Sequence, residues 1–133
     1  VTPTGHVYEM YAPHQDGLSV ATTLETDGVS YRAGDKDATI PAVAASASVK
    51  GSRLFLTVTN CHAEQAATVA VQLRGGSATG ATARTLTGEI HSHNTFDRPA
   101  ALEPEPLDVA AHGASFNLEL PPASVSTLSI ELE

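Results

Sequence analysis

The first sixteen residues carry the apolar spacing of a helix. Four side chains recur at i, i+3, i+4 and i+7, which is one helical face: Val7, Met10, Tyr11 and His14. Thr2 followed by Pro3 is a typical start signal, because threonine caps free N–H groups and proline fits the first turn. Pro13 opposes continuation, so we predict a short amphipathic helix that ends near Tyr11 or Ala12. A helix this short needs something to pack against.

From Leu18 onward the period changes to two, which is the period of a half-buried β-strand. Apolar and polar side chains alternate clearly in five stretches: 43–49, 54–59, 68–73, 116–120 and 128–132. The alternation is weaker in three others: 18–26, 28–33 and 80–92. Short pairs of turn-forming residues separate the stretches: Asp27-Gly28, Gly34-Asp35, Gly51-Ser52, Gly75-Gly76 and Pro121-Pro122.

Short strands joined by turns at near-regular intervals are typical of a two-sheet antiparallel β-sandwich. We therefore predict an all-β, jelly-roll-like fold preceded by the short N-terminal helix. The longest stretch without a pattern is 93–105, which we expect to connect the two sheets. A chain of 133 residues has room for one domain core. Because it begins at Val1 rather than methionine, we expect it to be a piece of a longer protein.

Charge and cysteine content narrow the classes of partner and compartment. Fifteen acidic against seven basic residues give a formal net charge of −8, which disfavours nucleic acid and anionic membranes as partners. No apolar run approaches the roughly 18 residues of a membrane span, and no signal peptide opens the chain. The single cysteine, Cys61, excludes an internal disulfide and fits a reducing compartment, so we expect a cytoplasmic protein.

The candidate nucleophiles and metal ligands lack a supporting context. No Gly-x-Ser-x-Gly motif singles out a serine for a Ser-His-Asp triad. Cys61 and His62 are adjacent and would point to opposite faces of a strand, so we interpret Cys61 as a small residue at a strand end. His91 and His93 could share one strand face, but zinc would need further ligands, such as His112 or an acid. We interpret this pair as a polar strand end and predict neither a metal nor a cofactor.

Carboxylates and aromatic rings are the remaining candidates. Glycoside hydrolysis needs two carboxyl groups at a fixed separation, and nothing in the sequence marks such a pair. The acids fall mostly in turns or at outward strand positions, among them Asp27, Asp35, Asp37, Glu119 and Glu131. Sugar binding by stacking needs exposed aromatic rings, but tryptophan is absent and we expect Phe55 and Phe116 in the core. The aromatic residues left for a sugar platform are Tyr8, Tyr11 and Tyr31.

Five segments, taken in order, match a known pattern: 2–15 (TPTGHVYEMYAPHQ), 40–48 (IPAVAASAS), 54–60 (LFLTVTN), 93–97 (HNTFD) and 120–125 (LPPASV). Together they resemble the C-terminal part of family 51 α-L-arabinofuranosidases. The first segment is similar to the stretch that ends the catalytic barrel of that family, and the others are similar to strands and a loop of its C-terminal sandwich. Gly5 and Pro13 depart from the family pattern and make the first helix less secure here.

The resemblance implies two parts: the tail of the last helix of a (β/α)8 barrel with its linker in residues 1–16, and the C-terminal β-sandwich domain in 17–133. In that family two glutamates at the ends of barrel strands act as acid/base and nucleophile, with retention of configuration. Neither glutamate lies in the matched segments, so no catalytic, cofactor-binding or metal-binding residue is carried over. The resemblance therefore implies a chain that is inactive alone.

The hypothesis drawn from the resemblance is a non-catalytic domain that packs on its own catalytic barrel and stabilises it. The parent enzyme would remove terminal α-L-arabinofuranosyl residues from arabinan, arabinoxylan or their oligosaccharides, and similar enzymes are usually homo-oligomers. The alternatives are an accessory carbohydrate-binding module and a generic adhesion-type interaction sandwich. If the helix has lost its barrel, Val7, Met10 and Tyr11 should be either disordered or buried against another copy of the chain.

Overall fold

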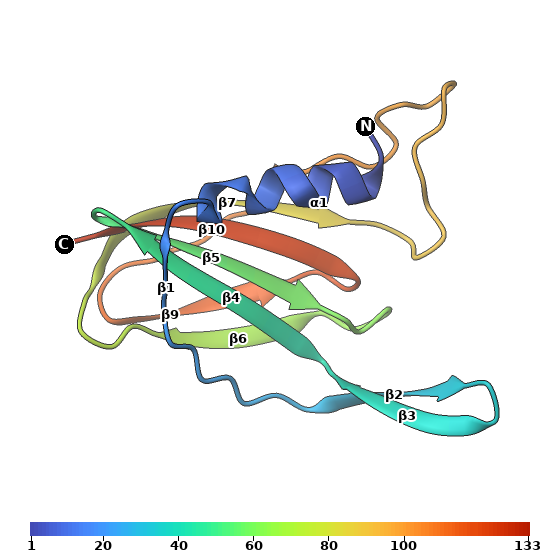
Figure 1. Cartoon of the computed structure of the whole chain (residues 1–133), viewed down its shortest axis with the longest axis horizontal. Coiled ribbons are helices and arrows are strands. Elements are labelled where there is room, and N and C mark those ends of the chain that lie inside the picture. Colours follow the sequence, from blue (N-terminus) through green and yellow to red (C-terminus); the bar gives the residue numbers. More distant parts are fainter.

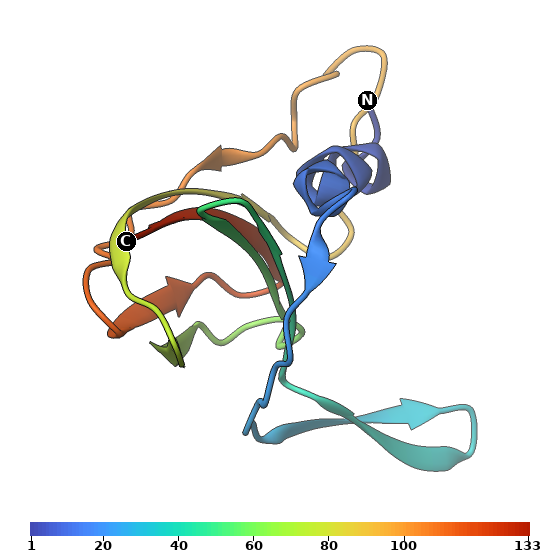
Figure 2. The ribbon, with the colours of Figure 1, turned by 60° about the vertical axis from the view of Figure 1, so that its left-hand side comes forward.

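The fold is a large antiparallel sheet with a smaller sheet across one face and a helix on the other (Figures 1 and 2). The computed structural model describes residues 1–133. The six-stranded sheet has the order β1-β4-β5-β10-β7-β8, while β6 pairs with β9 and β2 pairs with β3. The elements are α1 (Pro3–Tyr11), the 3-10 turn η1 (Ala12–His14), β1 (Leu18–Ser19), β2 (Gly28–Ala33), β3 (Lys36–Pro41), β4 (Val43–Lys50), β5 (Arg53–Asn60), β6 (Ala67–Gln72), β7 (Ala78–Thr87), β8 (Glu105–Pro106), β9 (Ser115–Leu120) and β10 (Ser124–Leu132).

Long antiparallel ladders join the central strands of the large sheet. β5 pairs with β4 on one side and with β10 on the other, and β10 pairs in turn with β7. Leu128 of β10 lies opposite both Leu56 and Ala83, so the apolar positions of three strands share one face. Gly51 turns the chain from β4 to β5 with a φ of 60°, a conformation that glycine adopts without steric cost.

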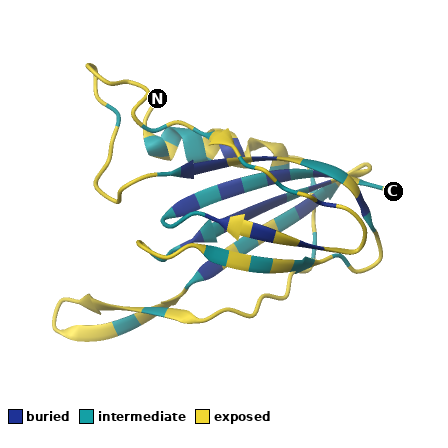
Figure 3. Cartoon of the chain, turned by 180° about the vertical axis from the view of Figure 1, so that it is seen from behind, coloured by how far each residue is buried: buried dark blue, intermediate teal, exposed yellow.

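The core lies between this face and the β6–β9 pair. Burial alternates along β9, where every second side chain faces the core and Glu119 faces solvent. Figure 3 shows the buried positions gathered in the central strands and β9. The predicted all-β sandwich is therefore confirmed. Its core cluster consists of Val43, Leu54, Leu56, Val58, Ala78, Ala83, Ala111, Phe116, Leu118, Leu120, Leu128 and Ile130.

Asn60 ties together the connections at one end of the sandwich. It is buried at the last position of β5, and its side-chain Nδ2 donates to the carbonyl oxygens of Gln65 (2.9 Å) and Pro121 (3.0 Å). Its Oδ1 accepts from the backbone N–H of His62 at 3.0 Å. One amide therefore binds three backbone groups in the β5–β6 and β9–β10 connections, and the Pro121 carbonyl also accepts from Ser124 Oγ at 2.7 Å.

The five clear strand predictions all correspond to strands, but the weaker ones need correction. The stretch 18–26 forms only the short β1, and 80–92 corresponds to β7, which ends at Thr87. The expectation that 93–105 connects the two sheets is wrong, because this loop joins β7 to β8 of the same sheet. β3 was missed because neither face of the β2–β3 hairpin is buried by the sandwich, so its sequence needs no alternation. Phe55 is also not in the core: its position on β5 faces away from Leu54 and Leu56, on the outer face of the sheet.

The N-terminal helix begins and ends as predicted. The Thr2 hydroxyl accepts from the Gly5 N–H at 3.0 Å, Pro3 follows at the first helical position, and α1 ends at Tyr11. Met10 is only 3% exposed, although no second copy of the chain is present. Leu86 is buried on the same outer face of the sheet, and neither residue belongs to the core cluster. No helix in the chain is long and apolar enough to cross a membrane.

The prediction that Met10 is either disordered or buried against another copy of the chain is therefore wrong. The outer face of β7 and β10 covers this side chain within the same chain, so α1 needs no second copy to bury it. Val7 is half-buried and Tyr11 is 37% exposed, whereas Tyr8 at 78% exposure faces solvent. The helix is thus anchored by its inner side, and its outer side is free.

Candidate functional site

His14 joins the end of the helical segment to the outer face of the large sheet. Its ring lies between two hydroxyls: Nδ1 is 2.6 Å from Ser48 Oγ on β4, and Nε2 is 2.7 Å from Thr57 Oγ1 on β5. A neutral imidazole carries one N–H donor and one acceptor, and a hydroxyl can serve either one. Both ring nitrogens are therefore satisfied, and the exit of the helix is fixed to two strands at once.

The surroundings of His14 are aromatic rather than acidic. The Tyr11 ring lies 5.7 Å away and the Phe55 ring 6.4 Å away edge-on, with the Lys50 ammonium 6.0 Å from the Phe55 centroid. Burial lowers the pKa of His14 below its ordinary value of 6.5, because the charged ring loses solvation. The imidazole is consequently neutral at pH 7.

The contact between His14 and Ser48 has the residue types of a nucleophile and its base, but not their setting. Ser48 is buried, so a substrate has no access to its hydroxyl. The second ring nitrogen meets the Thr57 hydroxyl, where a catalytic histidine has a carboxylate that orients it. The pair therefore holds α1 on the sheet. Sequence reasoning missed this role because it counted His14 with the apolar stripe of the helix.

The histidines considered as metal ligands do not converge. His91 and His93 lie in the loop after β7, which ends at Thr87. The interpretation of this pair as a strand end is therefore wrong. Nδ1 of His93 is 3.1 Å from the carbonyl oxygen of His91, a contact local to the loop. His112 lies between β8 and β9. No group of three or more histidine, cysteine, aspartate or glutamate side chains is placed to hold a metal ion.

Cys61 lies where it was predicted, directly after the last residue of β5, and is a free thiol. Its neighbour His62 is engaged elsewhere: Nδ1 accepts from the backbone N–H groups of Glu64 (3.2 Å) and Gln65 (3.0 Å). This nitrogen is therefore not free to deprotonate a thiol. The two residues shape the turn after β5.

The acids named from the sequence are dispersed over the surface. Asp37 lies on β3 rather than in a turn and pairs with Arg32 at 3.2 Å, and Glu131 pairs with Arg53 at 3.3 Å. Both pairs are exposed, and exposed pairs contribute little to stability. Asp35 lies in the turn of the β2–β3 hairpin, and Glu119 faces solvent on β9. The named acids thus lie on different elements rather than forming one catalytic pair.

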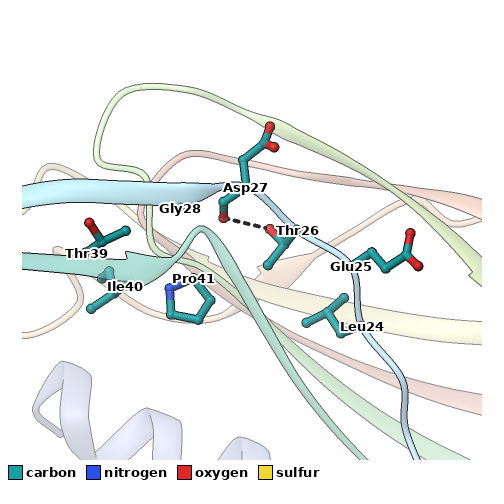
Figure 4. A pocket seen from close by; sticks show the side chains of 8 residues that line it. All are labelled: Leu24, Glu25, Thr26, Asp27, Gly28, Thr39, Ile40 and Pro41. Atoms are coloured by element: carbon teal, nitrogen blue, oxygen red, sulfur yellow. Dashed lines mark hydrogen bonds between the residues drawn. The ribbon is translucent and has the colours of Figure 1, made fainter.

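An open hollow of about 530 Å³ lies at the base of the β2–β3 hairpin. Its carboxylates, Glu25 and Asp27, are directed away from the apolar side chains of the hollow (Figure 4). Among the lining side chains, only the Thr26 hydroxyl hydrogen-bonds another lining residue, donating to the Asp27 carbonyl at 3.2 Å. The hollow thus lacks converging polar groups that would orient a ligand. Its lining comprises Leu24, Glu25, Thr26, Asp27, Gly28, Thr39, Ile40 and Pro41.

The three tyrosines proposed as a sugar platform are exposed but lie apart. Tyr8 and Tyr11 lie on α1, whereas Tyr31 lies on β2 in the projecting hairpin. The helix and the hairpin occupy opposite sides of the molecule in both ribbon views (Figures 1 and 2). A stacking platform needs adjacent rings, and these elements do not provide it with all three.

The fold and these contacts define a β-sandwich domain with a helix fixed to its outer face and no assembled metal centre. The sequence model of the α-L-arabinofuranosidase C-terminal domain matches residues 1–124. The chain belongs to this family.

Relatives with known names agree with this assignment. An intracellular exo-α-L-arabinofuranosidase of Bacteroides ovatus is 28% identical over 134 residues, covering 98% of this chain and 26% of the relative. The crystal structure of the GH51 arabinofuranosidase from Xanthomonas axonopodis pv. citri is 34% identical, with a TM-score of 0.86 over 98% of this chain and 26% of that one. The arabinose complex of the Thermotoga maritima α-L-arabinofuranosidase is 25% identical, with a TM-score of 0.82 and coverage of 98% and 29%. The chain thus spans about a quarter of the length of these relatives.

Proposed function

We propose that this chain is the non-catalytic C-terminal domain of an α-L-arabinofuranosidase and that it packs on the catalytic domain and stabilises it. The observation that carries the proposal is the family match over residues 1–124, combined with relatives of which the chain covers about a quarter. A sandwich with its own core and no paired carboxylates fits a domain of this kind. The catalytic part is then the remainder of the protein.

The parent enzyme, in this proposal, hydrolyses terminal non-reducing α-L-arabinofuranosyl residues of arabinan or arabinoxylan oligosaccharides with retention. Retention requires a nucleophilic carboxylate and an acid/base carboxylate about 5–5.5 Å apart. We place both on a (β/α)8 barrel outside this chain. Support comes from the relatives, which are named arabinofuranosidases, and from the dispersed acids of this domain.

We also propose that residues 1–16 are the tail of the last barrel helix and that 17–133 form the sandwich domain. α1 contributes to no part of the core cluster, and its outer side, with Tyr8 78% exposed, is free to meet other helices. The His14 contacts would then hold the barrel helix on the sandwich. We further propose a cytoplasmic homo-oligomer, and the name of the Bacteroides relative supports an intracellular enzyme.

The test compares this chain with the complete protein that carries it. The complete protein should release arabinose from an aryl α-L-arabinofuranoside, and the 133-residue chain should release none. Turnover by the chain that survives repurification would overturn the non-catalytic assignment. An affinity of the isolated chain for arabinan would favour the carbohydrate-binding alternative instead. Light scattering of the complete protein measures the oligomeric state.

A further inference from the structure

Phe96 lies at the tip of the long loop between β7 and β8 and is 105% exposed. No other large apolar side chain of the molecule is so fully in solvent, and Ile90 in the same loop is 66% exposed. A single exposed apolar residue on a surface is ordinary. What distinguishes Phe96 is that the loop which carries it is closed by hydrogen bonds.

Asn94 closes the tip of the loop. Its Oδ1 accepts from the Leu102 N–H at 2.7 Å, and its Nδ2 donates to the Leu102 carbonyl at 2.8 Å. Within the tip, the Arg98 N–H donates to Thr95 Oγ1 at 3.1 Å, and the Thr95 N–H donates to the Arg98 carbonyl at 3.2 Å. The ring of Phe96 is thus displayed on an ordered turn. An ordered turn loses little conformational entropy when it binds.

The base of the loop is fixed as well. Leu102 packs directly over Gly88, where an added Cβ would overlap the leucine side chain. Asn94 also donates to the carbonyl oxygen of Val1 at 2.8 Å, which ties the loop to the residue that precedes α1. Figures 1 and 2 both show the loop beside the N-terminus. The tip therefore stands on the side of the molecule where the chain enters the domain.

We propose that Phe96 is the anchor by which this domain docks onto the polypeptide that precedes residue 1 in the complete arabinofuranosidase. This inference rests on the proposed function and adds the contact that holds the two parts together. The occupant follows from position, because the loop is bonded to Val1 and the relatives have about three quarters of their length outside the matched part. Exposed aromatic side chains are typical central anchors of interfaces.

The residues next to Phe96 indicate the chemistry of its receptor, the surface of the preceding polypeptide that accepts the ring. Phe96 is followed along the chain by Asp97 and Arg98, and neither charged side chain forms an ion pair within this chain. The receptor is therefore an apolar pocket whose rim carries a carboxylate within reach of Arg98 and a basic group within reach of Asp97. The ring enters the pocket, and the ion pairs at the rim set the orientation of the loop.

Hydroxyl-radical footprinting of aromatic side chains tests the proposal on the isolated chain and on the complete protein. Three rings report three surfaces: Phe96 the loop, Tyr8 the helix and Tyr31 the hairpin. We expect the oxidation rate of Phe96 to fall about tenfold or more in the complete protein, as for a side chain moved from solvent into a packed pocket. Tyr31 serves as the internal control and should keep the rate it has in the isolated chain.

The other outcomes distinguish a failure of the Phe96 anchor from a failure of the proposed function. If Tyr8 becomes protected while Phe96 keeps its rate, the domain docks through another surface and this inference fails, although the proposed function stands. If none of the three rings is protected, packing of the domain on a catalytic part fails too. Protection of Phe96 already in the isolated chain, lost on dilution, would identify a second copy as the occupant and overturn the proposal.

Substitutions in the complete protein give a second measurement. Phe96→Ala should weaken docking roughly 10- to 100-fold, as expected from the burial of one phenylalanine ring. The readout is limited proteolysis at the junction between the two parts. Phe96→Leu should restore most of the protection, and Tyr31→Ala serves as the matched control that leaves the cleavage rate unchanged. Equal cleavage rates for Phe96→Ala and Tyr31→Ala would contradict the anchor.

Discussion

At the scale of single residues, the polar side chains inside this domain hold backbone that the apolar core cannot. Asn60 is buried with three backbone partners, and His14 bridges two strands through their hydroxyls. Each replaces water that burial has removed from polar groups, and such groups are costly when left without a partner. Their substitution should therefore cost more than the loss of one contact.

Asn60→Ala removes three hydrogen bonds to the connections between strands, and of the three backbone groups only the Pro121 carbonyl keeps another partner, the Ser124 hydroxyl. We expect it to lower the free energy of unfolding by about 3 kcal/mol, with the urea m-value unchanged. The matched control is Asn117→Ala, on an exposed position of β9, which should change stability by less than about 0.5 kcal/mol. Equal effects of the two substitutions would contradict the role given to Asn60.

The lowered pKa of His14 predicts how stability depends on pH. In the unfolded chain the ring titrates near its ordinary value of 6.5, whereas burial lowers the pKa in the folded chain. Protonation therefore favours the unfolded chain. The stability that the neutral His14 ring contributes is fully present above pH 6.5 and is lost as the pH falls from there through the pKa of the folded chain.

His14→Gln removes the titrating group from this site. Denaturant unfolding at pH 7.5, 6.5 and 5.5 should show a smaller fall in stability for this variant than for the wild type. His93→Gln is the matched control for the substitution itself, since this exposed loop position should change stability at pH 7.5 by less than about 0.5 kcal/mol. A slope in His14→Gln as steep as that of the wild type would assign the pH dependence to other groups.

At the scale of elements, α1 and the β2–β3 hairpin contrast in how they meet the sandwich. α1 buries Met10 against the outer face of the sheet, whereas the hairpin strands pair only with one another. Helix α1 is thus part of the folded unit, and the hairpin is an appendage that projects from it (Figure 1). This difference can be measured in two ways.

Met10→Ala should destabilise the chain by about 2–3 kcal/mol, because it empties a buried site on the outer face. Tyr8→Ala is the matched substitution on the exposed side of the same helix and should be nearly neutral in the isolated chain. Thermal unfolding followed by circular dichroism measures both. If Met10→Ala is also neutral, the helix is not packed on the sheet in solution.

Backbone amide exchange should rank the strands by their burial. The amides in the ladder between β5 and β10 should exchange only on global unfolding, whereas those between β2 and β3 should exchange through local opening and much faster. Two-dimensional NMR in deuterated water resolves the two groups. Comparable protection in both ladders would show that the hairpin is stabilised by something beyond its own pairing.

The same contrast explains what could be predicted from the sequence. β5, β9 and β10 alternate because one face is buried, so their period of two is visible in the residues. β3 has no buried face and thus no signal. The role of His14 and the bond from Asn94 to Val1 depend on strands and a terminus far away in the sequence, which no local pattern encodes. The family pattern identified the domain, but not these contacts.

At the scale of the whole molecule, the position of the core decides how the sandwich could stabilise a neighbouring catalytic domain. Leu128 lies at the centre of the large sheet, between β5 and β7, and is 2% exposed. Leu128→Ala should cost the isolated chain about 2–5 kcal/mol. If the domain supports the catalytic part, the same substitution should also lower the temperature at which the complete protein loses arabinofuranosidase activity.

This effect on activity would arise without any change near the reacting groups, so initial rates at low temperature should equal those of the wild type. Arg32→Ala on the exposed hairpin is the control and should alter neither the melting of the isolated chain nor the inactivation temperature. If Leu128→Ala lowers the melting temperature of the chain alone but not the inactivation temperature, the two parts unfold independently. That result would contradict the proposal that the sandwich stabilises the catalytic part, because a stabilising domain must pass its own loss of stability on through the interface between the two parts. The family assignment would still stand, since it rests on the sequence match.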